Sequence, residues 1–570
     1  MEYEVLNPWG EVDKVPPMGL QPRVQDLKDK TIGLFAGFKG HWVLILREVE
    51  RQLKERFPGA KFSLYQYPKD MSSTRDVCEV ANDDEYRPSF EKWLKEVDTV
   101  VSGNGDAASC ALTLAYNTSF IEKMGKPAVM LVNKTLVTEA WAGASVRNVP
   151  GLRVVQTSIP DLSAFFSLED AIEDIVRPGV AAVIDDIITA LTKPLTEEEK
   201  SPSRELGEES RIVFKGSLEE VNRFFYQRGW AYGMPIVPPT EESVRGMLTG
   251  TDLPADYVVA KIPPMLGKAT VEKIAVNAVM AGCLPTYMPV LIAAVQALGD
   301  RPKIWLEGYV CSVASWAPLL CISGPIHRDL HVNSGANLMS PYYRANAAIG
   351  HAMGQIILNI GGTRPGMEDM SFVGHEGRYG MCIAENEEES PWQPLRVDYG
   401  FGKEDSTVSL FWYNGRQYLG SAGNAATILR RLCDNINVFA WDPGCLLIML
   451  PSTAKALANA GLTKKDVISY LVEYARVPAA DVNVRWFRES HHEPEEFLLP
   501  LDDPTRSMRK FYSSKHTAIV VAGLSYSWGT VSYSGGGTHG TIVTKKIELP
   551  ANWDKLVVKY KDIVPTYAPY

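Results

Sequence analysis

The stretch Val100–Cys110, VVSGNGDAASC, decides how the first part of the chain folds. The apolar run Thr99–Val101 is typical of a buried strand, and the segment Ala107–Lys123 is compatible with a helix. We expect Gly103–Asp106 to form a tight turn between them. Ligands of parallel sheets bind at the carboxyl ends of the strands, and the N–H groups that open a helix favour negative charge. The thiol of Cys110, in that first helical turn, is therefore a candidate thiolate.

The same alternation of apolar runs and amphipathic segments continues on both sides of this stretch. The expected strands are Thr31–Phe38, Lys61–Tyr67, Thr99–Val101, Pro127–Val132 and Leu152–Thr157. The expected helices are Trp42–Phe57, Asp84–Val97, Ala107–Lys123, Thr135–Val146 and Leu168–Leu191. Strands that alternate with helices of this length predict βαβ units with right-handed crossovers. We expect an α/β domain with a flavodoxin-like parallel five-stranded sheet in the order 2-1-3-4-5.

This strand order predicts which loops face each other. Its switch point lies between strands 1 and 3, so the loop with Lys39 and His41 should face the loop Gly103–Asp106. A base or cation beside a thiol at a helix start activates the cysteine. The expected catalytic residues are Cys110, His41 and Lys39, the expected substrate-binding residues are Gly103, Asn104, Gly105, Asp106 and Ser109, and Asn133–Glu139 should form the far wall. A core position for Cys110 and a surface position for His41 stay open.

Length and composition limit the classes of protein. A chain of 570 residues, 45% hydrophobic and 22% charged, is typical of a soluble globular protein with two or three domains. A net charge of −10 without a basic block argues against nucleic-acid and membrane partners. The first residues do not form a secretory signal, and no apolar run is long enough for a membrane span. Eight cysteines without a CxxC pair predict reduced thiols in the cytoplasm. We expect a small-molecule substrate, no cofactor and a homo-oligomer.

The composition along the chain predicts four regions. Residues 1–30 form an extended arm, 31–192 the α/β domain, 193–211 a charged, solvated linker, and 212–570 a mixed α/β or α+β domain, either single or split into two subdomains. Ser217 and Glu220 form a capping-box pattern at the start of a helix. Strands are expected at Ile304–Tyr309 and Cys445–Leu450, and no internal repeat is evident.

Four residues of the second domain carry possible chemistry. Cys283 and Cys382 are candidates for a second thiol that approaches from the other domain. Asn337 and Arg344 belong to a polar group that enters a helix, and their side chains suit a carboxylate or amide ligand.

Two further patterns have a functional and a structural interpretation. The acidic stretch AENEEES, residues 384–390, is either a bend that aims carboxylates into a cleft or a solvated acidic turn. The spacing of His327 and His331 fits one helical face, but no third ligand is evident, so we expect no metal site.

The run VDTVVSGNGDAASC, together with GKPAVMLVNK, resembles the UGSC family of bacterial proteins and selenoproteins. Its signature is a glycine-glycine-aspartate turn followed by selenocysteine or cysteine, glycine, serine and cysteine. The later runs VEKIAVNAVMAGC, VNSGAN and AENEEESPW look like the C-terminal portion of long members. The turn is also similar to that of glycine-reductase-type selenoprotein subunits, in which a chalcogen nucleophile displaces a group from carbon.

The sequence departs from the family pattern at two positions. Ala107 stands where the family has selenocysteine or cysteine, and Ala108 where it has glycine, whereas Cys110 matches the final cysteine. A methyl group is neither a nucleophile nor a redox partner, so these positions cannot form a pair of chalcogens.

Three classes of function stay open from the sequence. The first is an enzyme whose Cys110 thiolate makes or breaks a carbon–sulfur or carbon–heteroatom bond of a small organic substrate. The second is a thiol-based reductase, which the selenoprotein resemblance implies. The third is a binding or scaffold protein that has lost its nucleophile.

Overall fold

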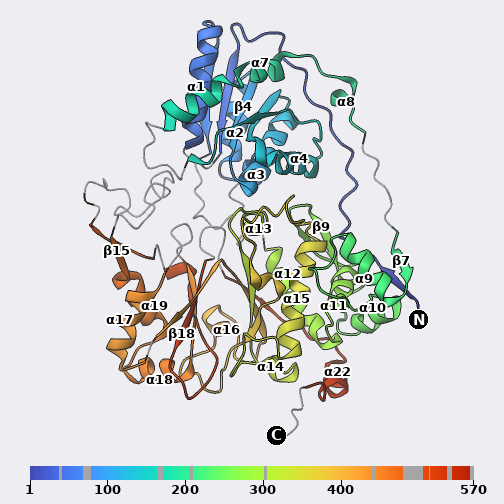
Figure 1. The fold of residues 1–570 in the computed structure, drawn as a ribbon, viewed down its shortest axis with the longest axis vertical. Coiled ribbons are helices and arrows are strands. Elements are labelled where there is room, and N and C mark those ends of the chain that lie inside the picture. The colour runs from blue at the N-terminus through green and yellow to red at the C-terminus, as the bar shows by residue number, and fades with distance from the viewer. Residues whose placement is uncertain are drawn as a thin grey trace.

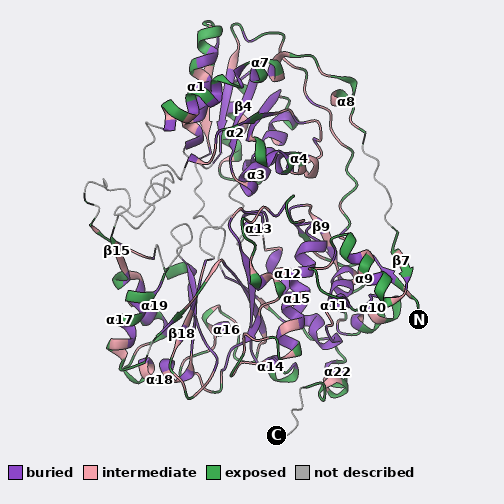
Figure 2. Cartoon of the chain, in the orientation of Figure 1, coloured by how far each residue is buried: buried purple, intermediate pink, exposed green. Residues whose placement is uncertain are grey.

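The computed structural model describes residues 1–37, 41–67, 79–162, 171–203, 210–300, 305–420, 422–437, 444–478, 503, 505–511, 514–535 and 542–564. Figure 1 shows a smaller α/β unit at the top and a larger part below it. The buried residues concentrate in the sheets of both parts and in the helices that cover them (Figure 2).

The upper unit is built on one parallel sheet. Its strands are β2 (Thr31–Ala36), β3 (Lys61–Gln66), β4 (Thr99–Gly105), β5 (Ala128–Asn133) and β6 (Val154–Thr157). They are arranged as β3-β2-β4-β5-β6, which is the order 2-1-3-4-5 counted from the first strand of the unit. The predicted flavodoxin-like topology is therefore confirmed. The helices of the unit include α1 (His41–Arg56), α2 (Arg87–Lys95), α3 (Ala108–Lys123) and α4 (Val137–Val146).

The predicted turn at Gly103–Asp106 is wrong, because strand β4 continues to Gly105. The glycines serve close packing instead. A Cβ at Gly103 would lie 2.9 Å from the Trp42 ring, and a Cβ at Gly105 would lie 2.9 Å from the Cα of Ala111. Glycine occurs both in turns and where backbones approach closely, so its presence in the sequence is compatible with either arrangement.

The long helix predicted at Leu168–Leu191 is interrupted. A π-helical turn, η4 (Ile172–Val176), leads into α6 (Arg177–Ala181), and α7 (Ile184–Thr192) follows. Pro178 accounts for the π-helical turn before it, because it has no backbone N–H and its ring crowds the preceding turn. The break between α6 and α7 falls later, at residues 182–183. The start of the predicted helix lies outside the described residues.

The N-terminal arm reaches from the upper unit to the larger part. Strand β1 (Tyr3–Leu6) pairs antiparallel with β7 (Ile212–Gly216), directly after the linker. The linker, expected to be solvated, contains the short helix α8 (Glu197–Lys200). Arg153 pairs with Glu199 of α8 at 2.8 Å, so part of the linker is docked on the upper unit.

Helices form one outer layer of the larger part. They are α9 (Leu218–Gln227), α10 (Glu241–Leu248), α11 (Val271–Met280), α12 (Met288–Leu298), α13 (Leu306–Val310) and α15 (Arg344–Asn359). The capping box of Ser217 and Glu220 is confirmed at the start of α9. The strand predicted at Ile304–Tyr309 is wrong, because its described residues form α13. A short apolar run without periodicity does not distinguish a buried strand from a buried helix.

Two four-stranded sheets form the next two layers of the larger part. One has the order β11-β10-β12-β19, with β10 (Ala317–Ser323), β11 (Cys382–Ala384), β12 (Thr407–Tyr413) and β19 (Val543–Lys546). The other has the order β13-β18-β14-β17, with β13 (Gly415–Leu419), β14 (Cys445–Met449), β17 (Thr517–Val521) and β18 (Thr530–Ser534). Apolar side chains from both sheets form one shared core. The helices α17 (Ala425–Asn435), α18 (Pro451–Asn459) and α19 (Lys464–Tyr474) cover the outer face of the second sheet, which gives an α/β/β/α arrangement (Figure 1).

Both sheets share one strand pattern, although the sequence gives no evident repeat. In each, a central strand (β10 or β14) is parallel to one neighbour (β11 or β17) and antiparallel to the other (β12 or β18). The outer edges, β19 and β13, are antiparallel to β12 and β18. The chain changes sheet between β12 and β13 and again between β18 and β19. Strand β13, which follows the strands of the first sheet in the chain, is therefore an edge of the second sheet, and β19, which follows the strands of the second sheet, is an edge of the first.

Helix α3 belongs to the cores of both parts. Of its 16 residues, 14 are buried, as expected of a helix that is apolar on most sides. Cys110 and Leu114 lie in the core of the upper unit, whereas Leu112 and Tyr116 lie in the core of the larger part. The Tyr116 hydroxyl donates a hydrogen bond to the carbonyl of Pro264 at 3.3 Å. The helix that follows the quoted stretch therefore joins the two parts.

Candidate functional site

A buried histidine–aspartate pair lies at the carboxyl edge of the first sheet. His41 begins α1 after β2, and Asp106 follows β4. The Nε2 of His41 lies 2.5 Å from Oδ2 of Asp106, and both side chains are fully buried. Oδ1 of Asp161, in the loop after β6, lies 3.7 Å from the same nitrogen. Because β2 and β4 flank the point where the strand order reverses, the pair occupies the predicted switch point.

The indole of Trp42 fixes Asp106 against His41. Its Nε1 donates a hydrogen bond to Oδ2 of Asp106 at 2.9 Å. Two glycines leave room for the ring, because a Cβ at Gly37 or Gly103 would lie 2.4 or 2.9 Å from it. Gly37, which follows β2, and Gly103, within β4, therefore leave the space that places this carboxylate.

The side chain of Asn104, an expected substrate ligand, holds the loop after β6. Its Nδ2 donates to the carbonyl of Ile159 at 3.2 Å, and its Oδ1 accepts from the Thr157 hydroxyl at 2.7 Å. The Asn133 amide donates to the same carbonyl at 3.0 Å. These contacts anchor the loop that carries Asp161.

Cys110 is the third residue of α3, and 4% of its surface is exposed. Ser109, the residue before it, is also buried, and its carbonyl accepts from the Thr113 hydroxyl at 2.8 Å. The sheet edge thus brings the His41–Asp106 pair to the start of the helix whose first turn holds the thiol. Lys39 lies outside the described residues.

Asp106 has a different position from the one expected of a substrate ligand. The sequence predicted that Asp106 binds substrate, but its carboxylate is paired with His41. This arrangement suits a residue that orients the imidazole.

Glu139, in the first turn of α4, is a buried carboxylate that the sequence placed only in a wall. Its surface is 1% exposed, and among the described residues no other side chain or backbone group hydrogen-bonds to its oxygens. Burial raises the pKa of Glu139 to about 7, and the charge of Glu368 adds to the rise. The sequence contains one indication of this burial, since Glu139 is the single charged residue of the otherwise mostly apolar helix VTEAWAGASV.

Glu139 faces the junction with the larger part. Glu307 of α13 and Glu368 are also buried there. The Cys311 thiol lies near all three carboxylates, and burial together with their charges raises its pKa well above the ordinary value. The carboxyl of Glu139 and the thiol of Cys311 therefore hold their protons more tightly than they would in water.

The other predicted residues lie within the larger part. Cys283 and Cys382 belong to its core, not to the core that holds Cys110, and burial raises the pKa of both thiols. Arg344 starts α15 and donates to the carbonyl of Gly282 at 3.1 Å through Nε and at 2.8 Å through Nη2. Asn337 lies on the exposed loop before α15, with a φ of +59°.

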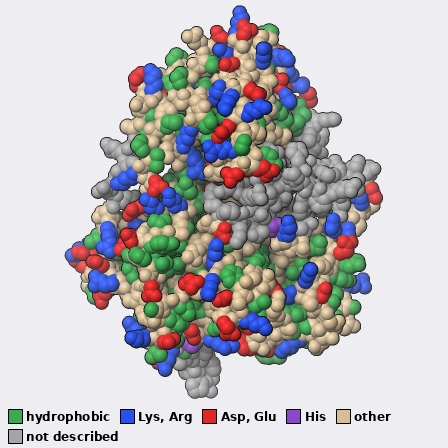
Figure 3. All heavy atoms as spheres, turned by 180° about the vertical axis from the view of Figure 1, so that it is seen from behind, with side chains coloured by type: hydrophobic (Ala, Val, Ile, Leu, Met, Phe, Trp, Pro, Cys, Tyr) green, Lys and Arg blue, Asp and Glu red, His purple; other side chains and the backbone are tan. Residues whose placement is uncertain are grey.

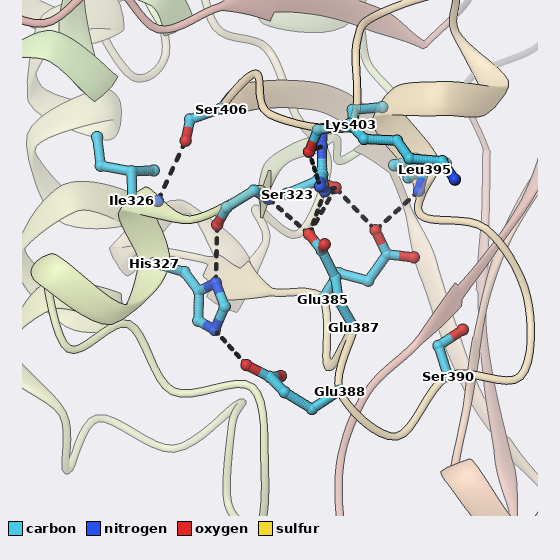
Figure 4. Close-up of polar contacts among 12 residues, drawn as sticks. Ser323, Ile326, His327, Glu385, Glu387, Glu388, Ser390, Leu395, Lys403 and Ser406 are labelled. Atoms are coloured by element: carbon cyan, nitrogen blue, oxygen red, sulfur yellow. Dashed lines mark hydrogen bonds and ion pairs between the residues drawn. The ribbon is translucent and has the colours of Figure 1, made fainter.

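The acidic stretch after β11 begins with a buried ionic network. Glu385 is fully buried and accepts from the Ser323 hydroxyl at 2.9 Å (Figure 4). Glu387 pairs with Arg396, and Lys464 lies 3.6 Å from Glu385. Glu385 and Glu387 therefore lie next to cations. They neither point into an open cleft nor form a solvated turn, which were the two interpretations of the sequence.

His327 and His331 make separate contacts and do not share a ligand. Nδ1 of His327 donates to the carbonyl of Gly324 at 2.8 Å, and its Nε2 lies 3.9 Å from Glu388 (Figure 4). Nε2 of His331 donates to the carbonyl of Lys561 at 2.9 Å.

One group in the described part of the chain has the donor types and spacing of a metal site. The ligand atoms of His41, Asp106 and Asp161 lie within 4.8 Å of one another. The hydrogen bond from Trp42 to Asp106 is the kind of contact that orients a carboxylate ligand.

None of the described helices combines the length and apolar character needed to cross a membrane. On the face seen in Figure 3, acidic and basic side chains are interspersed over both parts.

The fold and site define an α/β protein whose first domain has a flavodoxin-like sheet with a His–Asp pair at its switch point. Residues 4–193, the N-terminal third of the chain, match the model of the UGSC family, in agreement with the resemblance seen in the sequence. The FeoB G-domain from Methanococcus jannaschii aligns over 28% of this chain and 99% of its own, at 18% identity and a TM-score of 0.17. A comparison with curated proteins gives no match.

Proposed function

We propose that this protein is an enzyme whose Cys110 thiolate makes or breaks a carbon–sulfur or carbon–heteroatom bond of a small organic substrate. One observation carries the proposal: the buried His41–Asp106 pair precedes the helical turn that holds Cys110, at the switch point of the sheet. Cysteine nucleophiles use a thiol, an imidazole and a group that orients the imidazole.

The chemistry of each group suggests its role. When Asp106 accepts the Nε2 proton of His41, the neutral imidazole keeps its lone pair on Nδ1. That nitrogen is the proposed acceptor of the thiol proton. The N–H groups of the first turn of α3 favour the thiolate that results. Glu139, whose pKa is about 7, is suited to hold or release a proton near neutral pH.

The proposed step balances as a nucleophilic displacement. A bond forms between the sulfur of Cys110 and a substrate carbon, while the bond from that carbon to the leaving group breaks. The leaving group departs with the bonding electrons and receives the proton that His41 took from the thiol. Water then attacks the same carbon, the thiolate leaves with the sulfur–carbon electrons, and the proton lost by water restores the thiol.

A thiol-based reductase has less support. It needs a second thiol beside Cys110, and Ala107 supplies none. Cys283 and Cys382 lie in the other core, where burial raises their pKa values. A scaffold that has lost its nucleophile is the conclusion if Cys110 proves unreactive.

The rate at which iodoacetamide alkylates each cysteine of the native protein tests the proposal. Peptide mass spectrometry at pH values between 5 and 9 gives the alkylation rate of each thiol as a function of pH. We expect Cys110 to react fastest, with a midpoint below the ordinary thiol pKa of about 8.5. His41→Gln should move this midpoint back toward the ordinary value, because it removes the proton acceptor.

Cys433 is a suitable control, because it lies in the helical layer beside the second large sheet and burial raises its pKa to about 11. Cys433→Ser should leave the profile of Cys110 unchanged. A Cys110 thiol that reacts no faster than Cys433 in the native protein would exclude the thiolate mechanism.

The spacing of His41, Asp106 and Asp161 supports a second candidate, a metal-assisted reaction on the same edge. Imidazole and carboxylate ligands suit Zn²⁺ and Mn²⁺. Calorimetric titration with each ion should give one site that Asp161→Asn weakens while the alkylation of Cys110 stays unchanged. Absence of saturable binding to the wild-type protein would remove this candidate.

A further inference from the structure

A second candidate site lies in the larger part, in a cavity of about 670 Å³. It lies between α15, the short helix η6 (Glu376–Tyr379), and the crossing from β12 to β13. Met234, Leu338, Met339 and Met381 supply apolar walls. A cavity of this size accommodates a small organic molecule, and methionine side chains adapt to different shapes.

Two arginines line the same cavity. Arg344 uses Nε and Nη2 to donate to one carbonyl, that of Gly282, although a guanidinium has five N–H donors. Arg416 lies over the ring of Tyr418 at 5.4 Å and near the neutral Tyr533 hydroxyl, whose pKa burial raises to about 12. In the described part of the chain, neither arginine forms an ion pair with a carboxylate. Both therefore keep donors and charge for a ligand.

The other titratable groups of the cavity leave this positive charge in place. Nδ1 of His351 donates to the carbonyl of Tyr379 at 3.1 Å, and its Nε2 accepts from Gln355 at 3.0 Å. Burial lowers the pKa of His351, which favours the neutral form of its ring. The side chain of Glu376 is 79% exposed and lies 3.5 Å from His375. The solvated Glu376 is the one acid of the lining, against two arginines.

We propose that this cavity binds an organic carboxylate with an apolar body, with Arg344 and Arg416 as its anion-binding residues and the methionine-rich wall around its body. Guanidinium groups suit this ligand because their planar fork matches the two oxygens of a carboxylate. The site is separate from the His41–Asp106 edge and does not depend on the function proposed for Cys110.

Calorimetric titration with 4-phenylbutyrate and with its uncharged amide, 4-phenylbutyramide, tests the proposal. The pair has the same apolar body and differs in the charge. We expect one saturable site for the carboxylate and at least tenfold weaker binding of the amide. Arg344→Gln and Arg416→Gln should each weaken binding about tenfold, because each removes a charged hydrogen-bond donor.

Arg245→Gln is the matched control, because Arg245 is an exposed arginine of α10. This variant should bind 4-phenylbutyrate with the affinity of the wild type. Ala347→Phe, which fills the cavity from α15, should abolish binding without removing either arginine, and its thermal midpoint should match that of the wild type. Equal affinity for the carboxylate and the amide, unchanged affinity in both arginine variants, or no saturable binding would overturn the proposal. Cys110→Ser should bind the probe normally, which separates this test from that of the enzyme proposal.

Discussion

At the scale of single residues, one carboxylate oxygen links the glycine pattern to the chemistry. Oδ2 of Asp106 contacts both the imidazole of His41 and the indole of Trp42. The indole fits because Gly37 and Gly103 have no side chains. A larger residue at either position would displace Trp42, and through it the orientation of His41.

Glu139→Gln should raise the thermal midpoint at pH 8 and leave it almost unchanged at pH 4. The pKa of Glu139 rises from 4.5 to about 7 on folding. Below pH 4.5 both states hold the proton. As pH rises to 7, the unfolded state ionises first and the folded state loses stability, by about 3 kcal/mol at most.

Differential scanning calorimetry at both pH values checks this prediction. Glu198→Gln, on the exposed surface of α8, should leave the thermal midpoint unchanged at both pH 4 and pH 8. An effect of Glu139→Gln that is equal at both pH values would contradict the role of burial.

Arg396→Leu should destabilise the protein by about 1–3 kcal/mol, because it leaves the half-buried carboxylate of Glu387 without its cation while the Ser323 hydroxyl and the Gly324 N–H still hydrogen-bond to it. Urea denaturation, followed by tryptophan fluorescence, measures the loss. Adding Glu387→Gln should recover part of it, since the uncompensated charge is removed. Arg430→Leu, which changes an exposed arginine on α17, should cost little.

At the scale of elements, the junction of β4 and α3 depends on close contact between backbones. A Cβ at Gly105 would lie 2.9 Å from the Cα of Ala111 and 3.0 Å from its Cβ. The neighbouring helix α4 approaches as closely, because a Cβ at Gly143 would lie 2.6 Å from the carbonyl oxygen of Leu112. Helix α3 is thus held by contacts that any side chain would disturb.

Gly105→Ala should lower the free energy of unfolding by about 1–3 kcal/mol, because α3 must move to accept the methyl group. Gly246→Ala, within α10, should do the opposite and stabilise by about 0.5–1 kcal/mol, since an added Cβ there meets no atom within 4 Å. Chemical denaturation of both variants checks the contrast. Equal effects would show that helix propensity and not packing dominates.

At the scale of the whole molecule, the N-terminal arm and helix α3 are two of the elements that join the upper unit to the larger part. The arm adds β1 to β7 in the larger part, and α3 places Leu112 and Tyr116 in the core of that part. Arg147 lies 3.9 Å above the ring of Tyr116 and pairs with Glu79. The two parts therefore share apolar surface and are not merely tethered.

Leu112→Ala and Leu114→Ala should differ in where they loosen the protein. Each deletes a buried leucine of α3, at a cost of about 2–5 kcal/mol. Leu112 faces the larger part, so its loss should speed hydrogen exchange in α11 as well as α3. The loss of Leu114 should act on the strands of the upper sheet. Hydrogen exchange is measured by mass spectrometry. The same set of faster-exchanging segments in both variants would contradict this account.

The sequence by itself determined the order of the first sheet, the place of its switch point and the cap at Ser217. These follow from local patterns: apolar runs, helical periodicity and side chains that bond to nearby backbone. The place of His41 beside the loop after β4 followed from the strand order. The partner of His41 did not, because it depends on how Trp42 packs between two glycines.

Only the tertiary structure decided the rest. The strand that continues through Gly103 to Gly105, the helix α13 and the paired sheets with exchanged edges depend on neighbours distant in sequence. The same holds for the burial of Glu139 and for the ionic network of Glu385 and Glu387, whose cations come from other elements. A residue's type fixes which bonds it can make, but its burial and its partners are set by segments that the chain brings together when it folds.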